Sequence, residues 1–293
     1  MTTISQSGQS PKKALFLLRR IHRDLSCEGI EDAWAEAELI LCHATGLSKV
    51  DIYRDNPDIS EDIIKTVNDM VRKRLSRVPL QYITGEVDFL KLNIKVGPGV
   101  LIPRPETEIL VQEVYRLFKE GCLPPCPVIL DMGTGSGCIG LAIARLIPSS
   151  HVIGVDISPR AIKYSSENKA LNKIKNFHVL RGNLFEPVRD KTFALIVSNP
   201  PYVRTDEIAS LQQEIAFYEP RIALDGGKDG LDYYRLIIPQ SIDHLTKGGF
   251  LAFEIGIGQF EEIIRIAQRH GLALFRTKED FSSIKRVLIF RRP

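Results

Sequence analysis

The chain has 293 residues, which is long enough for one large domain or two modest ones. Its 39 basic and 36 acidic side chains leave a formal net charge of +3, too small to indicate a nucleic-acid substrate. No apolar run approaches the length of a membrane span, and the five cysteines lack the spacing of zinc ligands. We therefore expect a protein of the reducing cytoplasm, with no metal site and no membrane partner.

The first part of the chain predicts helices only. Residues 10–76 carry apolar side chains at helical spacing and show no strand signals. This pattern predicts a small helical N-terminal domain, which could merely cap a catalytic domain or could help to bind its substrate. Met1–Ser10 is polar, and we expect it to be disordered.

A glycine-rich loop in the middle of the chain is typical of a cofactor site. It follows an apolar segment, Pro127–Asp131, that predicts the first strand of a nucleotide-binding unit, and it precedes a predicted helix from Cys138 to Ile147. Glycines at this point permit a tight turn and a close approach of the backbone to a ligand. The pattern does not identify the cofactor, because NAD enzymes use similar loops. The loop residues are Gly133, Thr134, Gly135, Ser136 and Gly137.

The next predicted strand, His151–Asp156, ends in an acid nineteen residues after Gly137. An acid at this offset can accept hydrogen bonds from both ribose hydroxyls of a nucleoside. Asp156 could instead be the N-cap of the helix that opens near Pro159, but Ser158 can fill that role.

A third predicted strand, Phe177–Leu180, is followed by Asn183 and Leu184. Asn183 is placed to hydrogen-bond the edge of an adenine ring, with Leu184 or Phe185 against the face of the ring. The alternative is a plain turn.

The tetrapeptide Asn199-Pro200-Pro201-Tyr202 follows a buried-strand pattern, Phe193–Ser198. The Asn199 side-chain oxygen and the Pro200 carbonyl can accept hydrogen bonds from a planar NH₂ group, and Pro201 restricts the backbone that carries this carbonyl. Tyr202 offers a flat wall for a planar group. A proline-rich turn would explain the tetrapeptide alone. A glycine-rich loop followed by Asn-Pro-Pro-Tyr is, however, the pattern of S-adenosylmethionine enzymes that methylate a planar nitrogen.

The rest of the chain completes a seven-stranded sheet. Two closing strands joined by a short polar segment can pair as a hairpin. We therefore expect an α/β fold of the class I S-adenosylmethionine methyltransferases, with a Rossmann-like sheet whose last strand is antiparallel. The predicted elements are helix Asp229–Leu245, strand Gly249–Glu254, helix Gln259–His270, strand Leu272–Lys278 and strand Arg286–Arg291.

From about residue 10 to its end, the chain closely resembles the protein-(glutamine-N5) methyltransferases of the HemK/PrmC type. Asn-Pro-Pro-Tyr is shared with adenine methylases, so the specificity of the resemblance rests on Arg104–Glu108 and on the loop Gly226–Gly230. The matching blocks are Pro79–Gly85 with Phe89, Leu101–Glu108, Asp131–Ile139, Val155–Ser158, Ser198–Tyr202, Glu219–Pro220, Ala223–Leu231 with Tyr234–Arg235, and Glu254–Gly256 with Gln259.

This resemblance implies transfer of a methyl group from S-adenosylmethionine to the glutamine of the Gly-Gly-Gln loop of class I peptide chain release factors. It implies a helical release-factor docking domain (residues 1–78), a β-hairpin linker (79–104) and a catalytic domain (105–293). Carried over by position, the loop Gly133–Gly137 and Asp156 would bind the cofactor. Asn199, also near the cofactor, would hold the glutamine amide together with Pro200, and Tyr202 would line the pocket. Thr107 would approach the cofactor.

The sequence departs from the family at two points. Asn183 stands where many relatives carry Asp, so the adenine would meet an amide in place of a carboxylate. Asp280–Arg286 lacks the Gly-x-Asp/Asn-Arg pattern often seen there, which concerns the final hairpin and not the chemistry.

Three other functions remain open. A sister group that methylates a glutamine of a ribosomal protein shares every block. An adenine-N6 methylase of nucleic acids would be expected to have a basic region and aromatic side chains for a flipped base, but residues 1–80 contain only Phe16, Trp34 and Tyr53 as Phe, Trp or Tyr. An inactive binding module is disfavoured because the motif residues are intact, namely Gly133, Gly135, Asp156 and Asn199.

Overall fold

The structure, a computed structural model, describes residues 12–293, so the predicted disorder of Met1–Ser10 lies outside the described residues. The chain divides into two compact units, Met1–Thr84 and Gly85–Pro293. The predicted linker is therefore shared: residues 79–84 belong to the first unit and residues 85–104 to the second. The functional division into three parts stays a prediction.

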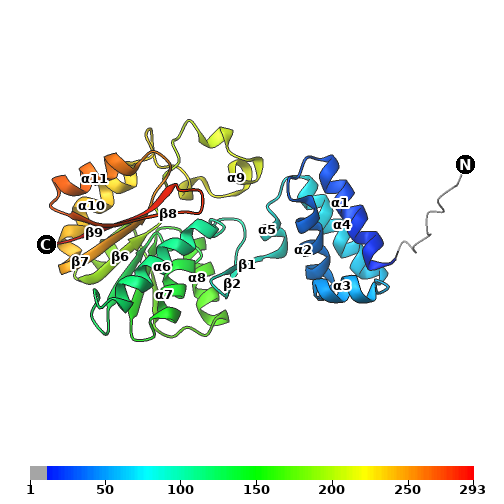
Figure 1. The fold of residues 1–293 in the computed structure, drawn as a ribbon, viewed down its shortest axis with the longest axis horizontal. Coiled ribbons are helices and arrows are strands. Elements are labelled where there is room, and N and C mark those ends of the chain that lie inside the picture. The colour runs from blue at the N-terminus through cyan, green and yellow to red at the C-terminus, as the bar shows by residue number, and fades with distance from the viewer. Residues whose placement is uncertain (1–11) are drawn as a thin grey trace, which may run out of the picture. The chain divides into compact units, whose positions relative to one another are not determined.

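The first unit consists of helices that pack around an apolar core, which includes Leu18, Ile40 and Val67. The periodicity of residues 10–76 arises because each long helix buries one apolar face in this core. A buried ion pair, Arg74 Nε to Glu36 Oε2 at 2.6 Å, joins the fourth helix to the second. The helices are α1 (Ala14–Cys27), α2 (Ala33–Thr45), α3 (Lys49–Asp55), α4 (Glu61–Leu75) and α5 (Leu80–Thr84) (Figure 1).

The second unit opens with a two-stranded antiparallel hairpin, β1 (Glu86–Phe89) and β2 (Leu92–Lys95). The buried Asn168 side chain ties this hairpin to the rest of the unit. Its Oδ1 accepts from the Lys95 backbone amide at 2.7 Å, and its Nδ2 donates to the Lys95 and Ser136 carbonyls at 3.0 and 2.9 Å.

A seven-stranded sheet in the order β5-β4-β3-β6-β7-β9-β8 forms the centre of the second unit. The last strand in the sequence, β9, runs antiparallel to both of its neighbours, β7 and β8. The strands from β5 to β7 in this order all pair in parallel. The predicted class I methyltransferase fold is confirmed. The strands are β3 (Val128–Met132), β4 (His151–Asp156), β5 (Phe177–Arg181), β6 (Phe193–Ser198), β7 (Leu245–Glu254), β8 (Ala273–Glu279) and β9 (Lys285–Arg291).

Helices cover both faces of this sheet, with α6, α7 and α8 on one face and α10 and α11 on the other (Figure 1). Beneath α10 and α11, apolar side chains of the sheet and the helices form a continuous core. The helices are α6 (Pro105–Lys119), α7 (Cys138–Leu146), α8 (Pro159–Leu171), α9 (Gln213–Tyr218), α10 (Asp232–His244) and α11 (Phe260–Arg269). Short 3₁₀ turns occur at Glu186–Val188, Ile208–Ser210 and Arg221–Ala223.

Two predicted boundaries differ from the observed ones by more than one residue. Strand β7 begins at Leu245 and not at Gly249, because Leu245 already pairs with Phe193 of β6, across a register shift. Helix α10 begins three residues late, at Asp232, because the Asp229 carboxylate accepts from the Leu231 amide and holds a turn there.

The closing hairpin forms although its sequence departs from the family pattern. Asp280 organises the turn: its Oδ1 accepts from the amides of Ser282 and Ile284 at 2.8 and 3.0 Å, and its Oδ2 accepts from Arg286 Nε at 2.8 Å. Ser283 takes the left-handed conformation, with φ of 59°. Hydrogen bonds to the Asp280 carboxylate therefore stabilise a turn that lacks glycine.

Candidate functional site

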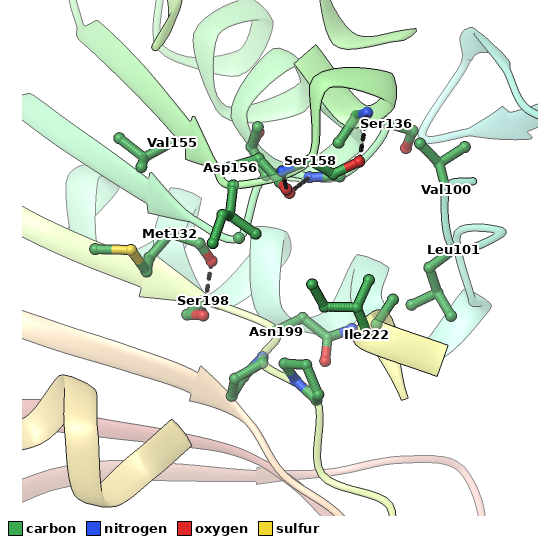
Figure 2. Close-up of a pocket in the computed structure, with 18 of the residues that line it drawn as sticks. Val100, Leu101, Met132, Ser136, Val155, Asp156, Ser158, Ser198, Asn199 and Ile222 are labelled. Carbon is green, nitrogen blue, oxygen red and sulfur yellow. Dashed lines mark hydrogen bonds between the residues drawn. The ribbon is translucent and has the colours of Figure 1, made fainter. Parts of the chain in front are cut away.

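A pocket opens at the carboxyl ends of β3, β4 and β6, where open α/β sheets bind their ligands. Figure 2 shows Asp156 and Asn199 on opposite sides of this pocket, with Val100, Leu101 and Ile222 along a further wall. The pocket therefore brings together the two motifs that the sequence places more than forty residues apart.

The glycine-rich loop forms one side of the pocket. Gly133 and Gly135 take left-handed φ values of 72° and 56°, and a Cβ atom on Gly133 would meet nothing within 4 Å. The loop therefore leaves space that a bound ligand can fill against the backbone. Gly137 has a different role, because a Cβ there would lie 2.9 Å from Ser165 Cβ and would separate α7 from α8.

Two backbone amides hold the Asp156 carboxylate. Its Oδ2 accepts from the Gly135 amide at 2.9 Å and its Oδ1 from the Ser158 amide at 2.8 Å. Burial raises the pKa of this carboxyl, and these backbone hydrogen bonds oppose that rise. Ser158 caps α8 by accepting from the Ala161 amide, so Asp156 is not needed as the cap and remains available to a ligand.

Asn183 and Leu184 line the pocket beyond Asp156. Leu184 takes the left-handed conformation with φ of 47°, which a branched apolar residue adopts only where its surroundings require it. The backbone amide of Asn183 donates to Glu186 Oε2 at 3.3 Å, so the side chain three positions later holds this turn.

The tetrapeptide after β6 forms the opposite side. Ser198 Oγ donates to the Met132 carbonyl at 2.7 Å and fixes the end of β6 to β3. Asn199 Nδ2 donates to Thr107 Oγ1 at 3.1 Å, which leaves Oδ1 as the acceptor available to a ligand. Pro200 and Pro201 line the pocket beside it.

Tyr202 lies behind this wall. Its hydroxyl donates to Glu254 Oε1 at 3.3 Å, and its carbonyl accepts from Gln259 Nε2 at 2.9 Å. Burial raises the pKa of Tyr202 above its ordinary value, so the hydroxyl stays protonated. In this structure Tyr202 thus contacts β7 and Gln259, the residue before α11, and does not line the pocket.

Two buried carboxyls support the site from below. Burial raises the pKa of Asp131 to about 7, while Oδ2 accepts from Thr134 Oγ1 and the Gly140 amide. Burial likewise raises the pKa of Glu254 to about 7. Sequence reasoning did not assign either acid to the site. The signal that identified Asp156, an acid at the end of an apolar strand, applies to both.

A buried carboxylate, Glu219, joins two segments that line the pocket, residues 99–103 and 220–223. Its Oε2 accepts from the Ile102 amide at 3.2 Å, and its Oε1 accepts from the Arg104 guanidinium. The two segments are more than a hundred residues apart, and this contact holds them on one side of the cavity.

We expect Glu219→Ala to lower the free energy of unfolding by about 2–3 kcal/mol, because it leaves a buried amide unpaired and removes the partner of Arg104. Urea unfolding followed by circular dichroism measures this loss as a lower midpoint at unchanged slope. Glu207→Ala is the matched control. Glu207 lies 3.6 Å from Arg204 in an exposed pair, so its removal should cost less than about 0.5 kcal/mol. Equal effects of the two substitutions would contradict the role given to Glu219.

Two family models match the chain: "Methyltransferase small domain" over residues 107–227 and "PrmC N-terminal domain" over residues 17–85. The release factor glutamine methyltransferase of Thermodesulfovibrio yellowstonii is 46% identical over 257 residues, which cover 88% of this chain and 92% of that protein. The chain belongs to the release factor glutamine methyltransferase family. The segment matched by the first model includes the glycine-rich loop, Asp156 and Asn199, which line the pocket.

Two solved structures share the fold of this methyltransferase. A methyltransferase from Pyrococcus furiosus aligns with a TM-score of 0.53 at 20% identity, covering 69% of this chain and 89% of that chain. The 16S rRNA N2 G1207 methyltransferase of T. thermophilus, solved in complex with AdoMet and guanosine, aligns with a TM-score of 0.51 at 16% identity, covering 71% and 50%. At these identities the likeness concerns the fold alone.

All predicted site residues of the methyltransferase except Gly137 and Tyr202 line the pocket, while their individual roles remain predictions. Sequence reasoning missed the apolar wall of Val100, Leu101 and Ile222, because nothing in the pattern distinguishes such residues from ordinary core. Residues 12–293 contain no cluster of acids, cysteines and histidines placed to hold a metal, and no helix among them is long and apolar enough to cross a membrane. The residues that line the pocket as predicted are Thr107, Gly133, Thr134, Gly135, Ser136, Asp156, Asn183, Leu184, Asn199, Pro200 and Pro201.

Proposed function

We propose that this methyltransferase transfers a methyl group from S-adenosylmethionine to the side-chain amide nitrogen of the glutamine in the Gly-Gly-Gln loop of class I peptide chain release factors. Membership of the family supports the reaction and the substrate. The single observation that carries the proposal is that one pocket has a nucleoside-type carboxylate, Asp156, on one side and the acceptor Asn199 on the other.

The residues present fit the cofactor. The open space beside Gly133 admits a ligand against the backbone, and Asp156 is fixed at the end of β4 where it can accept from ribose hydroxyls. Asn183 and Leu184 stand further along the same side, where an adenine would lie. The cofactor, when bound, supplies an electrophilic methyl group.

Asn199 and Pro200 hold and polarise the substrate amide. The nitrogen of a carboxamide is a poor nucleophile because its lone pair is delocalised into the carbonyl. Oxygen acceptors placed on its two hydrogens help to localise that lone pair and stabilise positive charge on the nitrogen as the new bond forms. This is electrostatic preorganisation, in which a single well-placed group is worth about 3–4 kcal/mol.

Deprotonation of the product needs no strong general base, because an N-methylated amide cation is very acidic. Asp156 is the one carboxylate that lines the pocket in the part of the chain the structure describes, and backbone amides on both sides hold it. Asp131 and Glu254 are fully buried behind the wall. The proton therefore leaves to water.

We further propose a cytoplasmic location, where release factors act in translation, and no direct nucleic-acid substrate. The net charge of +3 and the five unpaired cysteines support these two statements. The helical unit would help to dock the release factor. A ribosomal-protein glutamine is the second candidate substrate, since its methylation would use the same pair of acceptors.

The experiment offers the purified enzyme three substrates in parallel, with S-adenosylmethionine labelled in its methyl group. These are an unmethylated class I release factor, ribosomal protein stripped of methylation, and single- and double-stranded DNA. We expect label in the release factor, and none in a release factor whose Gly-Gly-Gln glutamine is replaced by alanine. Label in the ribosomal protein or the DNA alone would overturn the proposal.

A further inference from the structure

A short chain of hydrogen bonds runs from Asn199 into the interior of the second unit. Asn199 Nδ2 lies 3.1 Å from Thr107 Oγ1, and Thr107 Oγ1 lies 2.6 Å from Glu254 Oε2. Tyr202, the last residue of the tetrapeptide, donates its hydroxyl to the other oxygen, Glu254 Oε1. The three elements involved are α6, the end of β7 and the segment that follows β6.

The direction of this chain follows from the number of protons available. Thr107 has one hydroxyl proton, and an ionised Glu254 can only accept, so the hydroxyl donates to Glu254. The Thr107 oxygen then keeps its lone pairs for a donor, and the group opposite it must be the NH₂ of Asn199. The carboxylate thus determines which end of the Asn199 amide faces Thr107.

This choice matters for the proposed reaction, because an asparagine amide has nearly the same shape after a half-turn about its last bond. With Oδ1 toward the pocket, Asn199 accepts from a substrate NH₂. With Nδ2 toward the pocket, two NH₂ groups would oppose each other and the substrate would lose an acceptor.

Burial of the Glu254 carboxyl is energetically costly, and no ion pair with a neighbouring cation offsets this cost in the described part of the chain. Its side chain is 1% exposed, and no Lys or Arg lies within ion-pair distance in residues 12–293. The positive charge of Arg286 lowers the pKa of Glu254, but the Arg286 side chain pairs with Asp280. Both carboxylate oxygens instead accept from hydroxyls, one of which also contacts Asn199. A buried acid used in this way indicates function more than stability.

We propose that Glu254 and Thr107 are positioning residues, which hold the Asn199 amide with its oxygen toward the substrate. This inference rests on the proposed amide methylation. Neither residue needs to touch the reacting atoms. At neutral pH the raised pKa of Glu254, about 7, leaves a substantial part of the molecules ionised and able to accept.

The test compares Thr107→Val with Thr107→Ser, measured as kcat with release factor and as Kd for S-adenosylmethionine by calorimetry. Valine has nearly the shape of threonine but no hydroxyl, so we expect kcat to fall about tenfold with the cofactor Kd within twofold of wild type. Serine keeps the hydroxyl and should restore most of kcat. Glu254→Gln, which has a donor and an acceptor in place of two acceptors, should lower kcat in the same way.

Tyr234→Phe is the matched control, because the Tyr234 hydroxyl donates to the Glu254 backbone carbonyl at 2.8 Å and not to its carboxylate. Removal of this buried hydroxyl should lower the melting temperature but leave kcat within twofold. A Thr107→Val enzyme with unchanged kcat, or with a raised cofactor Kd and normal kcat, overturns the inference. Absence of methyl transfer by the wild-type enzyme would instead overturn the proposed function, so the two failures are distinguishable.

Discussion

Asn199→Ala should lower kcat by about 10²–10³-fold while leaving the Kd for S-adenosylmethionine within twofold of wild type. The substitution removes the side-chain oxygen that faces the substrate, and that contact strengthens as positive charge develops on the nitrogen. Asp156, which we propose to bind the cofactor, lies on the opposite side of the pocket and should stay in place (Figure 2).

Single-turnover kinetics with release factor, together with calorimetry of cofactor binding, separates these two effects. Asn199→Asp is a useful second variant, since it keeps an oxygen but replaces the NH₂ that contacts Thr107 at 3.1 Å. Near wild-type turnover in Asn199→Ala would show that the pair of acceptors is not what activates the amide.

Asp156→Ala should act on the opposite step, with the Kd for S-adenosylmethionine raised about 10- to 100-fold. Hydrogen bonds to a charged acceptor contribute about 1.5–3 kcal/mol, and each 1.4 kcal/mol is a tenfold change in affinity. The substitution also frees the Gly135 amide, which Asp156 Oδ2 now holds at 2.9 Å, so the glycine-rich loop loses a restraint.

Calorimetry at several cofactor concentrations measures this loss directly, and kcat at saturating cofactor should recover to within a few-fold of wild type. Asp280→Ala is the control, because this carboxylate also holds a turn through backbone amides but lies in the closing hairpin, outside the pocket lining. An unchanged cofactor Kd in Asp156→Ala would refute the ribose assignment.

The sheet and the polar residues at its carboxyl edge could be predicted because they depend on local patterns. Apolar runs such as Phe193–Ser198 predict buried strands, and parallel strands bring their carboxyl ends to one edge. For that reason the amino-acid pattern alone was enough to place Asp156, Asn199 and the glycine-rich loop in one pocket.

The supporting contacts could not be predicted, because they depend on which distant segments meet. Glu254 reaches the site only through the pairing of β7 with β6, in which Phe253 lies opposite Ser198. Its bond to Thr107 spans 147 residues, and the Glu219 to Arg104 contact spans 115. Tyr202 was expected to line the pocket because it follows Asn199 closely in the sequence. Its hydroxyl instead contacts the buried Glu254 carboxylate, a contact that the sequence does not reveal.

Tandem mass spectrometry of the methylated release factor tests the central claim most directly, since it locates the added methyl group to one residue and one atom. Purified enzyme, S-adenosylmethionine and an unmethylated class I release factor are incubated, and the peptide that contains Gly-Gly-Gln is fragmented. We expect a single methyl group on the side-chain amide nitrogen of that glutamine in the wild-type reaction, and strongly reduced transfer with Asn199→Ala. A methyl group on another residue, or on a carboxylate oxygen or a basic nitrogen, would contradict the assignment of this pocket to a planar amide.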